Sequence, residues 1–219
     1  MMRAKYFKEL EELKTEVILY GSFIEGMCRT LQKAFVEGDY EEAKLLADEE
    51  STVRSRERRI ENDCLRIMST QQPVAKDLRF ISSVLKIANN LQRIGGHVIE
   101  VVELLDFVGP INNLFAVNHL TEMNSRVMIM LKKALDSFVE NDLELAEEVI
   151  ASDNEVDALF DKTMDEIADR IRTDTENYKQ LIDAMQITKY LERIGDNTER
   201  IARWVIFAIK GDPEQQEQQ

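Results

Sequence analysis

The chain has 219 residues, an apolar content of 44% and only 8 glycines and 3 prolines, a composition typical of long helices rather than of disorder. Its formal net charge of −14 excludes nucleic acid as a main partner, because two negative surfaces repel each other. The charge is uneven, since residues 1–106 carry 16 Lys and Arg against 19 Asp and Glu, and residues 107–219 carry 12 against 23.

Nothing in the sequence is typical of a secreted or membrane-spanning protein. The N-terminal sequence MMRAKYFKELEELK lacks an apolar signal core, and the longest apolar run, Ile201–Ile209, contains Arg203 and is too short to cross a bilayer. Cys28 and Cys64 lie in helical patterns without a CxxC partner. We therefore expect a cytoplasmic protein with two reduced thiols in its core.

The apolar pattern predicts six helices separated by five breaks. The breaks fall at residues 38–39, 72–73, 109–110, 141–142 and 173–175. Asp39 is the expected cap of the second helix, with Glu42 completing a capping box. The last residues, 212–219, lack apolar side chains and are expected to form a disordered tail.

The two halves of the chain are copies of one unit. The segment FVEGDYEEA from Phe35 matches FVENDLELA from Phe138 at an offset of 103, and LQRIGG from Leu91 matches LERIGD from Leu191 at an offset of 100. Helices joined by short turns pack antiparallel. We predict an all-α fold of two tandem, pseudo-symmetric, antiparallel three-helix bundles, residues 1–108 and 111–211.

The fifth predicted helix carries a row of aspartates at four-residue steps, Asp153, Asp157, Asp161, Asp165 and Asp169. Each step turns the row by about 40°. Asp153 and Asp157 are therefore expected at the edge of the core, and Asp165 and Asp169 toward solvent. Like charges at this spacing repel each other by roughly 0.2–0.5 kcal/mol per pair, so the row favours a nearby cation or solvent screening.

A second acidic stripe, Glu192, Asp196 and Glu199, lies on the sixth predicted helix. Packing of the last two helices would bring four carboxylates together, namely Asp153, Asp157, Glu192 and Asp196. Oxygen-only clusters suit hard cations such as Mg²⁺, Ca²⁺, Mn²⁺ or iron. The alternative is a solvated acidic face with salt bridges to Arg193 and Arg200.

The first copy has mostly lost these carboxylates. The equivalent positions are Glu50, Arg54, Gln92 and Gly96, so no metal site is expected there. The same segment carries a run of arginines, Arg54, Arg56, Arg58 and Arg59. This run either neutralises part of an acidic protein or forms a contact patch for an acidic partner surface or anionic lipid.

Catalytic motifs are absent from the sequence. It contains no Gly-rich phosphate loop, no GxSxG and no zinc-spaced Cys/His set, and neither His97 nor His119 follows a Glu by three residues. We therefore do not expect an enzyme. Gly95 and Gly195 occupy equivalent mid-helix positions and are expected to allow close helix packing.

Several of these segments resemble the PhoU family. In the first repeat they are QQPVAKDLR from Gln71 and LQRIG from Leu91, and in the second YLERIGD from Tyr190 and DNEVD from Asp153. The resemblance covers residues 5–211. It implies a non-catalytic, often dimeric negative regulator of phosphate uptake and signalling, placed between the ATPase of the phosphate ABC transporter and a membrane sensor histidine kinase.

The family resemblance also implies a metal. Some members bind multinuclear iron or other metals through acidic pairs in each repeat, and here only the second repeat keeps the pattern, at Asp153/Asp157 and Glu192/Asp196. Three functions thus stay open: a regulatory adaptor, a carboxylate-cluster metal-binding protein or metal-dependent enzyme, and a purely structural dimer-forming bundle.

Overall fold

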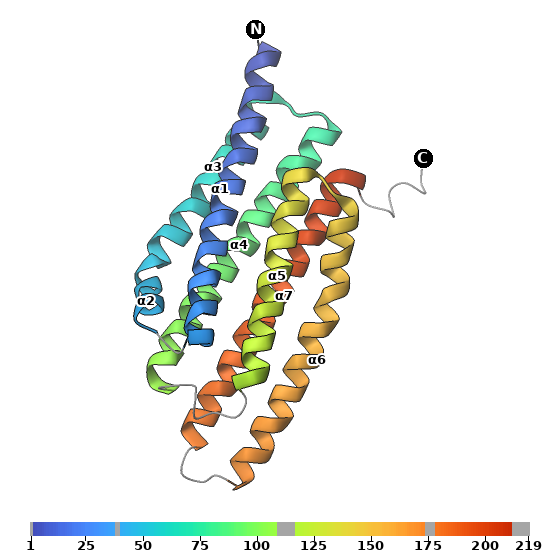
Figure 1. Ribbon diagram of the computed structural model, residues 1–219. Helices are drawn as coiled ribbons and strands as arrows, with labels where there is room; N and C mark the ends of the chain where they lie inside the picture. Colours follow the sequence, from blue (N-terminus) through green and yellow to red (C-terminus); the bar gives the residue numbers. More distant parts are fainter. Residues whose placement is uncertain (1, 38–39, 109–116, 174–177, 212–219) are drawn as a thin grey trace.

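The computed structural model describes residues 2–37, 40–108, 117–173 and 178–211, and this part of the chain contains helices and no strand (Figure 1). The elements are α1 (Met2–Glu37), α2 (Glu41–Lys44), the 3₁₀ helix η1 (Leu45–Glu49), α3 (Glu50–Gln71), α4 (Ala75–Val108), α5 (Val117–Glu140), α6 (Leu143–Thr173) and α7 (Tyr178–Lys210). The prediction of an all-α fold with two three-helix repeats is confirmed.

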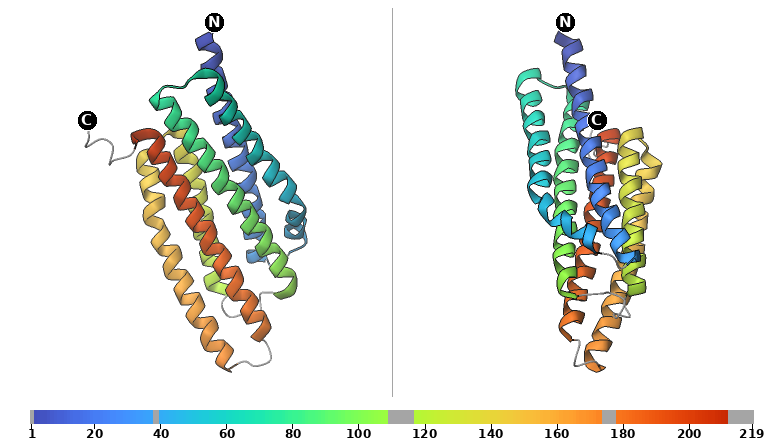
Figure 2. Two further views of the ribbon diagram at one scale, coloured as in Figure 1. Left: turned by 180° about the vertical axis from the view of Figure 1, so that it is seen from behind. Right: turned by 60° about the vertical axis from the view of Figure 1, so that its left-hand side comes forward.

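Four helices form a row in the order α3, α4, α7, α6, and α1 and α5 cover one face of that row (Figure 2). The central pair, α4 and α7, runs antiparallel. His97 packs on Tyr190 with 5.6 Å between ring centroids, and Lys86 lies 5.8 Å from the centroid of the Trp204 ring. The third helix of each repeat is thus central, and α3 and α6 form the two ends of the row.

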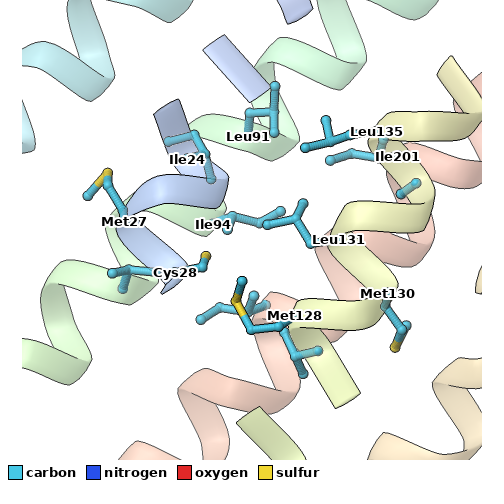
Figure 3. Packing of buried hydrophobic residues seen from close by; sticks show 14 of the residues in the cluster. Ile24, Met27, Cys28, Leu91, Ile94, Met128, Met130, Leu131, Leu135 and Ile201 are labelled. Atoms are coloured by element: carbon cyan, nitrogen blue, oxygen red, sulfur yellow. The ribbon is translucent and has the colours of Figure 1, made fainter. Parts of the chain in front are cut away.

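The two repeats share one hydrophobic core. Apolar side chains from α1, α4, α5 and α7 meet between them, among them Ile24, Leu91, Leu131 and Ile201, all at most 1% exposed (Figure 3). Each such burial contributes roughly 1.5–3 kcal/mol. The repeats therefore stabilise each other and are not two independent bundles.

The second predicted helix of the first repeat is interrupted, since α2, η1 and α3 replace one continuous helix. The equivalent segment of the second repeat, 148–152, continues as α-helix within α6. Leu46 is only partly buried, whereas its counterpart Val149 is fully buried. Since most helical stability comes from packing of the apolar face, the first-repeat segment is held less firmly.

The N-cap of α2 is Tyr40, without a side-chain capping hydrogen bond. The predicted cap Asp39 lies outside the described residues, so this prediction is not tested. Its counterpart Asp142 does cap α6, because the backbone N–H of Leu145 donates to Asp142 Oδ1 at 3.1 Å. The chain turns just before it at Asn141, with a φ of 54°.

Both cysteines are buried and free. Burial raises the pKa of the Cys28 and Cys64 thiols to about 12, so both stay protonated at neutral pH. The prediction of core thiols is confirmed, and neither sulfur is in the thiolate form that reacts readily.

The approach of α1 to α5 depends on Gly21. A Cβ at this position would lie 2.6 Å from Leu135 Cδ2, whereas a Cβ at Gly26 on the same helix would meet nothing within 4 Å. Gly21 therefore allows a contact between the two repeats that a larger side chain would disturb.

We expect Gly21→Val to lower the free energy of unfolding by about 1–3 kcal/mol through overpacking against Leu135. The matched control Gly26→Val should leave it unchanged or raise it slightly, since Val has the higher helix propensity. Urea unfolding of both variants measures the difference. Equal stability of the two would contradict a tight contact at Gly21.

Candidate functional site

Helices α6 and α7 approach each other closely because Gly195 lacks a side chain. A Cβ at Gly195 would lie 3.2 Å from Val156 Cγ1 and 3.4 Å from Asp153 Oδ1. The equivalent Gly95 brings α4 close to α1 and α3, where a Cβ would meet Ile24 Cδ1 at 2.9 Å. The predicted packing role of both glycines is confirmed, and in the second repeat it places Asp153 directly against α7.

Five carboxylates interact where α6 and α7 meet, and we call them the acidic cluster: Asp153, Asp157, Glu192, Asp196 and Glu199. Burial, as the largest cause, and the charges of the other four together raise the pKa of the half-buried Asp153 carboxyl to about 6. A carboxyl with this pKa is only partly protonated at neutral pH, so the repulsion is not fully relieved.

Two of the three cluster carboxyls on α7 also have raised pKa values. Burial raises the pKa of Glu192, and the charges of Asp196 and Asp157 add to the effect. Burial also raises the pKa of Asp196, although the neighbouring Arg200 acts against the shift. Carboxylates from both helices therefore lie within electrostatic reach of one another.

Arginines on α7 neutralise part of the cluster. Arg203 pairs with Glu199 at 2.6 Å, and Arg200 pairs with Asp196 at 3.5 Å. Arg193 instead lies over the Tyr190 ring, 5.6 Å from its centroid. Of the two salt bridges in the alternative interpretation, the one to Arg200 is present, and Arg193 makes a cation–π contact.

The predicted ligands Asp153, Asp157, Glu192 and Asp196 all belong to the acidic cluster. Within the described residues, however, no three His, Cys, Asp or Glu side chains are arranged so that they could hold a metal ion. The oxygen donors fit a hard cation in their chemistry but not in their present arrangement. Metal binding therefore stays a prediction.

Two details of the sequence-based site differ from the structure. Asp157 is exposed and lies farther from the core than the edge position expected, whereas Asp165 and Asp169 are solvent-exposed as expected. Glu199 belongs to the cluster although it was not among the predicted ligands. Its place on the stripe with Glu192 and Asp196 was the available signal.

At the equivalent place in the first repeat, α3 and α4 enclose a cavity of about 320 Å³. It is lined by Glu50, Arg54, Gln92, Gly96 and His97, among others. Arg54 pairs with Glu50 at 2.7 Å. A Cβ at Gly96 would meet nothing within 4 Å, so the loss of a side chain at this position leaves open space. Sequence reasoning found the equivalence of these positions but not the cavity.

The charge of Arg193 acts on titratable groups of both repeats. Burial lowers the pKa of His97 beside the cavity of the first repeat, Glu100 raises it, and Arg193 and Arg93 lower it. Arg193 also lowers the pKa of Glu192 and Asp196 in the acidic cluster. His97 is therefore neutral at neutral pH.

Comparison with known proteins places both repeats in one family. The sequence model of the PhoU domain matches residues 17–105 and again residues 120–205, inside the two predicted repeats. The phosphate-specific transport system accessory protein PhoU homolog of Clostridium acetobutylicum is 31% identical over 96% of this chain and 97% of its own length. The homolog of Pseudomonas aeruginosa is 28% identical over 93% of this chain and 84% of its own.

Solved structures show the same fold. The crystal structure of PhoU from Pseudomonas aeruginosa has a TM-score of 0.89 and 26% identity, covering 94% of this chain and all of the other. The phosphate transport system regulatory protein PhoU from Streptococcus pneumoniae has a TM-score of 0.84 and 22% identity, covering 94% of this chain and 98% of its own.

We expect Asp153→Asn to stabilise the metal-free protein at pH 7.5 by about 1 kcal/mol. The full pKa shift corresponds to roughly 3 kcal/mol, and solvent screening of a half-exposed carboxyl reduces this. The folded protein binds the Asp153 proton more tightly than the unfolded chain does. The contribution of this carboxyl to the free energy of unfolding is therefore fully present below its ordinary pKa of 3.8 and is lost as the pH rises through about 6. The gain in the variant should therefore shrink toward pH 4.

Urea unfolding in a chelator between pH 4 and 7.5 measures this effect. Asp165→Asn on the exposed face of α6 is the control and should change stability by less than about 0.5 kcal/mol at every pH. A gain at Asp153 that does not depend on pH would rule out the cluster as its cause.

Proposed function

This chain belongs to the PhoU family, and on that premise we propose that it is a negative regulator of phosphate uptake and phosphate signalling. It acts as a non-catalytic adaptor between the ATPase of the phosphate ABC transporter and a sensor histidine kinase. Its place is the cytoplasm, where these partners hold it at the membrane. Among the described helices none is long and apolar enough to cross a bilayer.

The observation that carries the proposal is the coverage of the match. Both repeats match the PhoU domain, and the Clostridium acetobutylicum relative, named an accessory protein of a phosphate-specific transport system, aligns over nearly the full length of both chains. A regulatory role in phosphate transport is therefore a property of the whole two-repeat unit rather than of one fragment.

The geometry favours an adaptor because duplication supplies two equivalent surfaces with different chemistry. The acidic cluster lies where α6 and α7 meet, and the cavity of the first repeat combines Arg54, Gln92 and His97 with Glu50. Charge complementarity decides which partner a surface accepts more than it decides affinity. Two surfaces of unlike charge on one shared core therefore suit two different partners.

A second candidate function is binding of a hard divalent cation, multinuclear iron included, at the acidic cluster. It is favoured by the raised pKa of Asp153, because a cation would relieve the repulsion that burial and four neighbouring carboxylates produce. Phosphate status would then reach the partners through the bound metal.

Partner capture from cells shifted between scarce and plentiful phosphate tests the adaptor. We expect Glu192→Lys with Asp196→Lys to reduce the recovery of one partner, the transporter ATPase or the sensor kinase, at least about tenfold. The matched Arg54→Glu with Gln92→Glu should reduce the recovery of the other partner. Recovery of neither a transporter ATPase nor a sensor kinase in either condition would sink the adaptor function. Normal phosphate-limited growth after gene removal would favour the structural bundle instead.

Elemental analysis of the purified protein tests the metal. We expect a stoichiometric divalent metal in the wild type and its loss in Asp153→Ala with Asp196→Ala. Asp165→Ala with Asp169→Ala, on the exposed side of the same helix, is the matched control and should keep the metal. Metal content that is absent, or equal in both double variants, would end this second proposal.

A further inference from the structure

The outer faces of α3 and α6 carry opposite charges at equivalent positions of the two repeats. At the repeat offset of 103, the column Arg54, Arg58, Asn62 and Arg66 on α3 corresponds to the column Asp157, Asp161, Asp165 and Asp169 on α6. We call these the basic column and the acidic column. Both rise in four-residue steps of about 6 Å along the helix, but the basic column has three cations against four carboxylates, because Asn62 is uncharged.

All eight side chains of the two columns are exposed, because each column lies on the side of its helix opposite the buried residues. On α3 the buried side includes Val53, Ile60 and Ile67, and on α6 it includes the equivalent Val156, Thr163 and, one turn further, Ile167. Most of each column thus points away from the core, although Arg54 also lines the cavity between α3 and α4 and Asp157 belongs to the acidic cluster.

The acidic column is largely unneutralised. Within the described residues, Asp157, Asp161 and Asp165 make no ion pair, and only Asp169 has a cation, Arg172 at 3.0 Å. Carboxylates four residues apart on one helix repel each other. The column therefore presents a row of charges that a matching row of cations would stabilise.

The basic column has cations to offer. Arg58 makes no ion pair within the described part of the chain, and Arg54 pairs only with Glu50 on its own helix. Arg66 is shared between Asp63 and Glu9, and Glu57 and Glu61 also lie beside the column, so Arg58 is its one cation without an ion pair within the described residues. The exposed Leu65 lies among these arginines and adds an apolar contact, and its counterpart on α6 is the small, exposed Ala168.

The two columns cannot meet within one molecule. They lie on α3 and α6, which form the opposite ends of the four-helix row (Figure 2). Any pairing between them therefore joins two copies of the chain.

We propose that the basic column on α3 of one copy docks against the acidic column on α6 of a second copy. The contact is head-to-tail, so each added copy leaves one free basic and one free acidic column, and association continues beyond a dimer as concentration rises. Exposed ion pairs are individually weak and are screened by salt. The association is accordingly reversible and salt-sensitive, and it goes beyond the adaptor function without depending on it.

Charge exchange between the columns tests the proposal. Arg54→Asp with Arg58→Asp gives a chain whose two columns are both net acidic, and Asp161→Arg with Asp165→Arg reverses the two central charges of the acidic column. Sedimentation velocity in about 0.1 M NaCl should show species larger than the 25.4 kDa chain for the wild type and for the mixture of the two variants. Each variant alone should sediment as a single chain, and about 1 M NaCl, where the screening length falls to about 3 Å, should dissociate the rest.

Controls separate a specific contact from a change in net charge. Lys8→Asp with Lys132→Asp alters the charge as much as the α3 variant, at exposed lysines on α1 and α5, and should keep wild-type association. A mixture that fails to associate, or a variant with two acidic columns that associates alone, would overturn the proposal. So would a wild type that stays a single chain but binds anionic phosphatidylserine vesicles through Arg54 and Arg58, which would assign the column to a membrane surface.

Discussion

The antiparallel contact between α4 and α7 decides the arrangement of the rest of the molecule. It places the third helix of each repeat at the centre of a four-helix row and joins the repeats through a shared core, with His97 against Tyr190 and Lys86 against Trp204. The second helix of each repeat is thereby left at an end of the row. This one contact determines the positions of the first-repeat cavity, the acidic cluster and the two charged columns.

Within that frame, duplication preserved the packing and changed the charges. Gly95 and Gly195 allow equivalent close helix contacts in the two repeats. The next position differs, since the first repeat has Gly96 where the second has Asp196. Helix packing tolerates little change in volume, but an exposed charge costs little to exchange. Duplication therefore produced equivalent surfaces with unlike chemistry. The charge of Arg193 acts on titratable groups in both repeats.

The sequence was sufficient for the features that repeat in order or in period. The two offsets predicted the tandem repeats, the paired glycines predicted close packing, and the acidic stripes predicted four of the five carboxylates of the acidic cluster. It was not sufficient where packing between distant segments decides. An apolar stripe shows that α1 is buried but not that α5 covers it at Gly21, and nothing local predicts the interruption at η1 or the cavity beside Gly96.

The convergence of the acidic cluster can be measured directly by NMR titration of the Asp153 side-chain carboxyl in metal-free protein. A pKa of about 6 is expected, because burial beside Gly195 and the charges of Asp157, Glu192 and Asp196 all disfavour ionisation. Titration at the ordinary aspartate value of 3.8 would show that these carboxylates stand apart in solution.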